Sequence, residues 1–217
     1  MSATSLTSCG FFALIGAPNV GKSTLINRIV GAKVSIVSSK VQTTRTRVLG
    51  ITIRDQSQII FIDTPGIFSP KRRLDRAMVA SAWGGASDAD GIILLVDAKR
   101  GVNADTRLII DGLKKQNRKV ILAINKIDSV KKPILLTLIS SLLKIGIFSE
   151  TFMISAETGD GVDGLIDNLI ELLPNGPWMY PEDQISDMPS RLLAAEITRE
   201  KVYQLLHQEE LETSKIC

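Results

Sequence analysis

The sequence predicts an α/β domain whose six-stranded sheet is mostly parallel, with one antiparallel edge strand and helices on both faces. Residues 92–96 and 120–124 are apolar runs without polar alternation, which is typical of strands buried on both sides. Helical stretches of ten or more residues separate such strands, and the last carries a clear apolar stripe over 162–173. This alternation predicts a parallel sheet that binds its ligand at the carboxyl ends of the strands.

The first half of the chain supplies the antiparallel edge. Residues 48–54, and the stretch that ends at 59–62, alternate apolar and polar side chains around a turn at 55–57. This pattern predicts a hairpin at one edge of the sheet. Before the hairpin we expect a strand at 11–15, a helix over 24–30, a short strand at 33–37 and a polar, basic loop at 38–47.

The second half repeats strand and helix. Apolar periodicity and breaker residues predict helices at 74–86, 104–116, 133–145 and 162–173, and strands at 92–96, 120–124 and 151–154. Residues 174–189 contain four prolines and are expected to be a linker. Another helix is expected at 190–208, with apolar residues on more than one side.

Composition places the chain among ordinary globular proteins. Of its 217 residues, 44% are hydrophobic and 23% are charged, and the net charge of +3 is compatible with a nucleic-acid partner but too small to argue for one. Cys9 and Cys217 form no disulfide framework, so a reducing compartment is expected. No run approaches about 18 apolar residues, so no transmembrane segment is predicted.

A phosphate-binding loop follows the first predicted strand. The pattern G-x-x-x-x-G-K-S lets backbone N–H groups and the start of a helix surround phosphate oxygens. Lys22 adds a full charge near the terminal phosphates, and the Ser23 hydroxyl can bind magnesium. An ordinary glycine turn is the alternative, but the strand-loop-helix context favours phosphate binding. The predicted nucleotide contacts here are Gly16, Ala17, Pro18, Asn19, Val20, Gly21, Lys22, Ser23 and Thr24.

Two further segments are predicted to recognise guanine. Asn125, Lys126 and Asp128 follow a buried strand, and a carboxylate such as that of Asp128 can accept the paired N–H donors that guanine has and adenine lacks. The alternatives are a helix cap for Asp128 and a turn role for Asn125. A weaker signal is the segment of Ser155, Ala156 and Glu157, which follows the last predicted strand. A backbone N–H of this segment could bond to the guanine oxygen.

The remaining motif concerns magnesium and the γ-phosphate. Asp63, Thr64, Pro65 and Gly66 supply a carboxylate for magnesium and a glycine N–H for the γ-phosphate. Thr43 and Thr44 are candidates for a second magnesium hydroxyl, although two threonines in a polar loop could simply be solvated. The candidate metal ligands are therefore Ser23, Thr43, Thr44 and Asp63.

In Ras-like enzymes the position directly after the motif's glycine, here Gly66, holds a glutamine that positions the attacking water. Ile67 stands there and cannot position water through a hydrogen bond. Asn19 could instead hold a potassium ion beside the phosphates, or it could only stabilise the loop. The candidate catalytic residues are Lys22, Asp63, Gly66 and Asn19.

Together the motifs resemble those of the P-loop GTPases over residues 11–173 and, more closely, those of the Era family. The closer resemblance rests on residues 16–27, 42–47 and 63–67, and on 189–201, which look like the opening of that family's RNA-binding KH domain. It implies a P-loop NTPase fold and a GTPase that uses GTP, GDP and Mg²⁺. It also implies a switch in small-subunit (30S) assembly that binds 16S rRNA, in the cytoplasm, with peripheral contact at the inner membrane.

The resemblance also divides the chain. Residues 1–9 are expected to be a disordered N-terminus, 10–174 the GTP-binding domain, 175–189 the linker and 190–217 an incomplete KH-like domain. No G-x-x-G loop follows residue 190, so weak or absent specific RNA binding is expected of this chain. Two other functions stay open, a P-loop phosphotransferase and a non-catalytic scaffold that binds guanine nucleotide.

Overall fold

The sheet has six strands in the order β2-β3-β1-β4-β5-β6. The computed structural model describes residues 7–37, 47–116, 118 and 120–213. All strand pairs are parallel except β2 with β3, so the predicted mostly parallel sheet with one antiparallel edge is confirmed. The strands are β1 Ser8–Gly16, β2 Val48–Arg54, β3 Ser57–Asp63, β4 Gly91–Asp97, β5 Val120–Asn125 and β6 Phe148–Met153.

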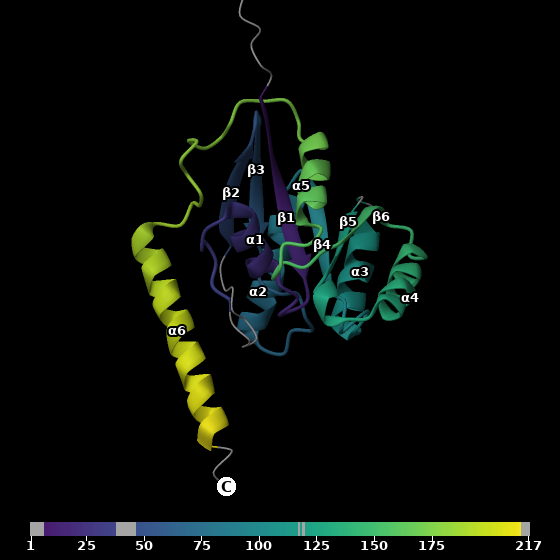
Figure 1. Ribbon diagram of the computed structural model, residues 1–217, viewed down its shortest axis with the longest axis vertical. Coiled ribbons are helices and arrows are strands. Elements are labelled where there is room, and N and C mark those ends of the chain that lie inside the picture. Colours follow the sequence, from purple (N-terminus) through teal and green to yellow (C-terminus); the bar gives the residue numbers. More distant parts are fainter. Residues whose placement is uncertain (1–6, 38–46, 117, 119, 214–217) are drawn as a thin grey trace, which may run out of the picture.

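The helices follow the predicted alternation. Figure 1 shows them around the sheet, with the C-terminal helix extending away from it. They are α1 Lys22–Val30, α2 Arg73–Ser87, α3 Ala104–Gln116, α4 Lys132–Leu143, α5 Val162–Glu171 and α6 Ser190–Thr213, with a short 3₁₀ turn η1 at Ile127–Ser129.

Strand register shows that α1 and α2 cover opposite faces. Gly50 in β2 lies directly opposite Phe61 in β3, so both point to one face. A Cβ at Gly50 would lie 2.4 Å from Ile26 of α1, which packs on that face. The next residue of β3, Ile62, points the other way and lies against Gly85 of α2.

The core explains why the apolar runs predict strands so well. Every residue of β3 and β5 is buried, as are all residues of β4 after Gly91. Strands that are covered on both faces need no polar alternation. At the β2–β3 turn, Asp55 adopts a left-handed backbone (φ 52°), a conformation that aspartate tolerates better than most residues.

Some boundaries differ from the predicted ones. The expected strand at 33–37 is absent, because the backbone N–H groups of Val34 and Ser35 bond to the Asn27 side chain and not to another strand. β1 begins at Ser8, inside the stretch expected to be disordered, because its N-terminal end pairs with β3. β6 begins at Phe148, three residues earlier than expected, beside a register shift at Val120 and Ile121.

The segment after α5 is held against the sheet. At its start, Cys9 N–H donates to Pro174 O at 3.2 Å. Farther along, the buried Gln58 amide of β3 accepts from Met179 N–H and Tyr180 N–H and donates to Tyr180 O. Residues 175–187, which we call the strap, therefore follow a defined path to α6.

The strap then runs beside the outer edge of β2. Ile51 N–H donates to Ile185 O at 2.9 Å, Leu49 N–H donates to the Asp187 carboxylate, and the Ser186 hydroxyl donates to Leu49 O. Beyond it, Glu200 of α6 forms an ion pair with Lys33, on the segment after α1. No helix in the described part of the chain is long and apolar enough to cross a membrane.

The Gln58 amide should contribute measurably to stability. In Gln58→Ala the N–H groups of Met179 and Tyr180 lose their acceptor, so we expect the free energy of unfolding in urea to fall by about 1–3 kcal/mol. Gln116→Ala, at the exposed end of α3, is the control and should change it by less than about 0.5 kcal/mol. Equal effects of the two substitutions would show that the Gln58 contacts do not stabilise the fold.

Candidate functional site

The predicted phosphate loop joins β1 to α1 and has a tightly fixed backbone. Asn19 (φ 62°) and Gly21 (φ 99°) are both left-handed. A Cβ at Gly21 would lie 2.3 Å from the amide nitrogen of Asn125, and one at Gly16 would lie 2.7 Å from Leu95 O. Both glycines are therefore required by close packing, and Gly21 also by its backbone angle.

The Lys22 side chain is buried inside this loop. Its ammonium donates to Gly16 O at 3.3 Å and to Ala17 O at 3.2 Å, so the charge lies within the curve of the loop. Burial lowers the pKa of Lys22 to about 8, and the Asp63 charge opposes only part of that shift. A buried cation that donates to carbonyl oxygens is suited to bind an anion that enters the loop.

Oxygen atoms converge next to the lysine. The Ser23 hydroxyl donates to Asp63 Oδ2 at 2.8 Å, and the Ser35 hydroxyl donates to the same oxygen at 2.7 Å. Hydroxyl and carboxylate oxygens are the ligands that magnesium prefers, so this donor set fits the ion. Two of the predicted metal ligands are thus brought together, and the other two, Thr43 and Thr44, lie outside the described residues.

The Asp63–Gly66 segment packs directly on the phosphate loop. Ile67 N–H donates to Gly16 O at 3.0 Å, and the Thr64 hydroxyl donates to Leu14 O at 2.7 Å. A Cβ at Gly66 would lie 2.9 Å from three atoms of Pro18, so only glycine fits there. Pro65 is also buried, and the Ile67 side chain is fully buried.

Asn125 connects two loops at the end of β5. Its amide nitrogen donates to Val20 O of the phosphate loop at 2.8 Å, and its amide oxygen accepts from Ala156 N–H at 2.9 Å. The side chain is buried, so both bonds are shielded from water. Asn125 therefore fixes the distance between the phosphate loop and the segment at 155–157.

The Lys126 side chain also contacts the phosphate loop. The residue has a left-handed backbone (φ 65°), and its ammonium donates to Asn19 O and to Asp97 Oδ2, both at 2.7 Å. Burial would raise the pKa of Asp97, but the bond and charge of Lys126, with N–H groups from Lys99 and Arg100, outweigh it and leave that pKa below its usual value.

The predicted base-recognition groups lie on η1 and on the segment that follows β6. Asp128 lies on η1 and is exposed, while Ser155 and Ala156 are buried. Arg28 of α1 donates to the backbone oxygens of Ala156 and Glu157, which ties the last loop to the phosphate-loop helix. The structure thus brings the three predicted motifs to one end of the sheet.

Several side chains in this site carried no recognisable sequence motif. Asp97 accepts from Lys126, Arg28 donates to Ala156 O, and Ser35 donates to Asp63. Only Asp97 had a usable signal, because it ends a buried strand at the same edge of the sheet as the motifs.

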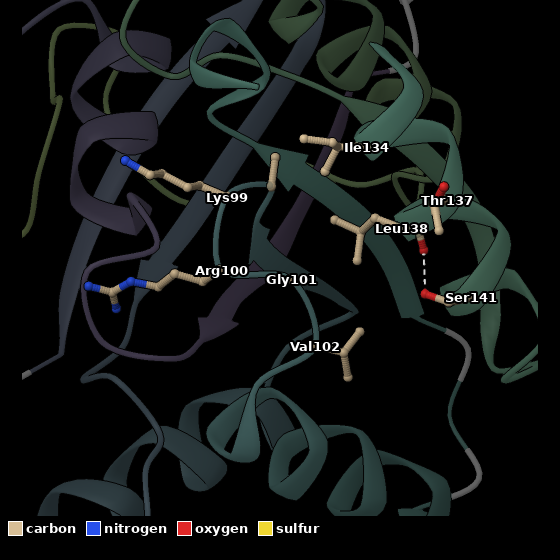
Figure 2. Close-up of a pocket in the computed structure, with 9 residues that line it drawn as sticks. Lys99, Arg100, Gly101, Val102, Ile134, Thr137, Leu138 and Ser141 are labelled. Atoms are coloured by element: carbon tan, nitrogen blue, oxygen red, sulfur yellow. Dashed lines mark hydrogen bonds between the residues drawn. The ribbon is translucent and has the colours of Figure 1, made fainter. Parts of the chain in front are cut away.

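A separate cavity lies beside the site. Its volume is about 430 Å³, and it lies between helix α4 and the segment that follows β4. Val102, Ile134 and Leu138 are among the residues that line it. Figure 2 shows the Lys99 and Arg100 side chains pointing away from Ile134 and Leu138. Arg100 instead donates to Pro18 O at 3.2 Å, so this cavity adjoins the phosphate loop without being part of it.

Comparison with known proteins agrees with this geometry. The family model described as "50S ribosome-binding GTPase" matches residues 11–126. GTPase Era of Sinorhizobium medicae is 61% identical over 203 residues, which are 94% of this chain and 66% of that protein. GTPase Era of Caulobacter vibrioides is 55% identical over 220 residues, covering 95% of this chain and 70% of that protein.

Two solved structures are also similar. Era in complex with MgGDPNP and nucleotides 1506–1542 of 16S ribosomal RNA matches with a TM-score of 0.85 and 44% identity, over 90% of this chain and 67% of that one. A variant of Aquifex aeolicus Era bound to GDP·AlF₄⁻ matches with a TM-score of 0.83, the same identity and the same shares.

The first curated relatives are longer than this chain, which spans 66%, 64% and 65% of their lengths. The similarity nevertheless extends over more than nine tenths of the chain and includes the phosphate loop, the Asp63–Gly66 segment and the Asn125–Asp128 segment. The chain belongs to the Era family of GTPases.

Proposed function

We propose that this protein binds guanine nucleotide and hydrolyses GTP to GDP and phosphate, as a switch in assembly of the small ribosomal subunit. One observation carries the proposal. The buried Asn125 side chain bonds both to the phosphate loop and to Ala156, so a base-recognition segment and a phosphate site form one rigid unit. The proposal agrees with membership of the Era family.

The phosphates are assigned to residues 16–24 and to Lys22. Lys22 can exchange its two carbonyl partners for phosphate oxygens without leaving the loop. The N–H groups of the loop and the start of α1 add partial positive charge. Gly66, packed on Pro18, is assigned the N–H that contacts the γ-phosphate.

The magnesium site is assigned to Ser23 and Asp63, with Thr43 or Thr44 as a further ligand. A magnesium ion would supply positive charge to the β- and γ-phosphate oxygens. Asp63 is positioned for this role by two hydroxyl donors and by complete burial. Thr64 and Pro65 hold the segment in place through the Leu14 contact and burial.

Guanine recognition is assigned to Asp128, Lys126 and the segment at 155–157. The exposed Asp128 carboxylate can accept the two N–H donors of guanine. The Lys126 ammonium donates to Asn19 O, so the side chain crosses the phosphate loop. Its aliphatic part can pack on the base there. The loop of Ser155, Ala156 and Glu157 can offer an N–H to the base oxygen, and Arg28 holds it in place.

Partners beyond the nucleotide rest on the relatives. An Era protein has been solved with a 16S rRNA fragment, which supports 16S rRNA and the small subunit as partners of this protein. We assign residues 8–174 to the GTP-binding domain, because β1 begins at Ser8, residues 175–189 to the linker and 190–217 to a KH-like segment. A cytoplasmic location with peripheral contact at the inner membrane completes the proposal.

Exchange of the base tests the proposal. Asp128→Asn presents an amide donor where guanine needs an acceptor, whereas the extra carbonyl of xanthine can accept it. We expect the variant to prefer XTP over GTP, the reverse of the wild type, in competition for fluorescent nucleotide and in phosphate release. An unchanged preference would remove Asp128 from the base site. Tight GTP binding without any turnover by the wild type would favour the scaffold over the GTPase.

The pKa of Lys22 predicts how nucleotide affinity depends on pH. Below about pH 7 the lysine is charged with or without ligand, so it should contribute no pH dependence to GDP affinity. Above about pH 8 the free protein must take up a proton to bind, so the affinity should fall by up to tenfold per pH unit.

Lys22→Arg provides the control, because arginine stays charged in this pH range. Guanine itself also titrates at high pH, but that effect is the same for the wild type and the variant. The GDP affinity of the variant should be weaker but should fall less steeply between pH 8 and 9, as measured by calorimetry. If the GDP affinities of the wild type and Lys22→Arg fell equally with pH, the titration of Lys22 would not be the cause of the loss.

Asn19 predicts a response to monovalent cations. The fully buried Ile67 cannot position water, so transition-state charge must be met in another way. A potassium ion bound by the Asn19 amide oxygen would add that charge. We expect faster GTP hydrolysis in potassium than in sodium at equal ionic strength, and loss of this difference in Asn19→Ala with GTP binding retained. Equal wild-type rates in the two salts would contradict a cation site.

A further inference from the structure

Ser35 lies in the proposed magnesium site, although no sequence motif marks it. Its hydroxyl donates to Asp63 Oδ2 at 2.7 Å, the same oxygen that accepts from Ser23 at 2.8 Å. Ser35 is 4% exposed and Asp63 is completely buried. Ser35 comes from the segment after α1, so a third part of the chain meets the phosphate loop and the end of β3 at this carboxylate.

Asn27 holds Ser35 in this position. Its amide oxygen accepts from Val34 N–H and Ser35 N–H, both at 2.9 Å, and its amide nitrogen donates to Ser35 O at 2.7 Å. Both polar ends of one side chain are used, and together they fix the three consecutive peptide groups from 33–34 to 35–36. Asn27 lies one turn after Ser23 on α1, so Ser23 and the Ser35 backbone are held by the same rigid helix.

A buried carboxylate needs such donors. Burial disfavours its charge, and each hydroxyl that donates to it both stabilises the charge and limits the rotation of the side chain. Groups that orient a metal ligand in this way commonly change metal affinity 10–100-fold when removed. The Ser35 hydroxyl meets this description, because it contacts Asp63 and not the phosphate loop itself.

We propose that Ser35 is a positioning residue for the magnesium site, with Asn27 as the side chain that places it. The proposal rests on the proposed function, since it takes Asp63 and Ser23 as the magnesium site. Ser35 acts through Asp63. Its loss should therefore weaken the effect of magnesium on bound nucleotide and leave the contacts of the nucleotide with the phosphate loop and base segment intact.

The test measures release of fluorescent mant-GDP from the full chain as a function of magnesium concentration. In Ser35→Ala the magnesium concentration that half-maximally slows release should rise by about tenfold or more. In EDTA the variant and the wild type should release mant-GDP at the same rate. Ser35→Thr keeps a hydroxyl and should restore the wild-type magnesium response. Asn27→Ala should shift it in the same direction as Ser35→Ala.

Ser57→Ala is the matched control. Ser57 is a buried serine at the opposite end of β3 from Asp63, with its hydroxyl near Ser8, and its loss should leave the magnesium response unchanged. A wild-type magnesium response in Ser35→Ala would overturn the inference, as would faster release in EDTA, which indicates general damage to the nucleotide site. Failure of the wild type to bind mant-GDP would instead count against the proposed function.

Discussion

The two hydrogen bonds of the Asn125 side chain are the constraint on which the rest of the site depends. They join the phosphate loop to the loop after β6 through one buried amide. The amide approaches so closely that residue 21 can have no side chain. β5 lies between two other strands of the sheet, so the core fixes the position of this amide. The amide in turn fixes the positions of the two loops that it contacts.

Other contacts extend the same principle. Lys126 joins Asp97 to the phosphate loop, and Arg28 joins α1 to the loop at 156–157. Each bond crosses between elements that are far apart in the sequence but adjacent at the carboxyl end of the sheet. The loops of the site are thus held mainly by side chains from rigid elements, an arrangement that preorganises a site before its ligand arrives.

The parts that could be predicted are those with local signals. The apolar runs at 92–96 and 120–124, the hairpin alternation and the phosphate-loop pattern each carry their own physical cause within a few residues. The ends of these strands then indicate Asp63 and Asn125. The strand expected at 33–37 is absent because the side chain of Asn27, on the preceding helix, accepts from two of its N–H groups, a side-chain contact that apolar periodicity does not report. Ser35 and Arg28 gain their roles only from tertiary contacts that no spacing encodes.

The strap has a consequence for the sheet itself. β2 is an edge strand, and its outward backbone groups would otherwise be open to another strand. The N–H groups of Leu49 and Ile51 are occupied by Asp187 and Ile185, and the Leu49 oxygen by Ser186. The segment that leads to α6 therefore also closes the β2 edge of the sheet to pairing with a strand of a second copy.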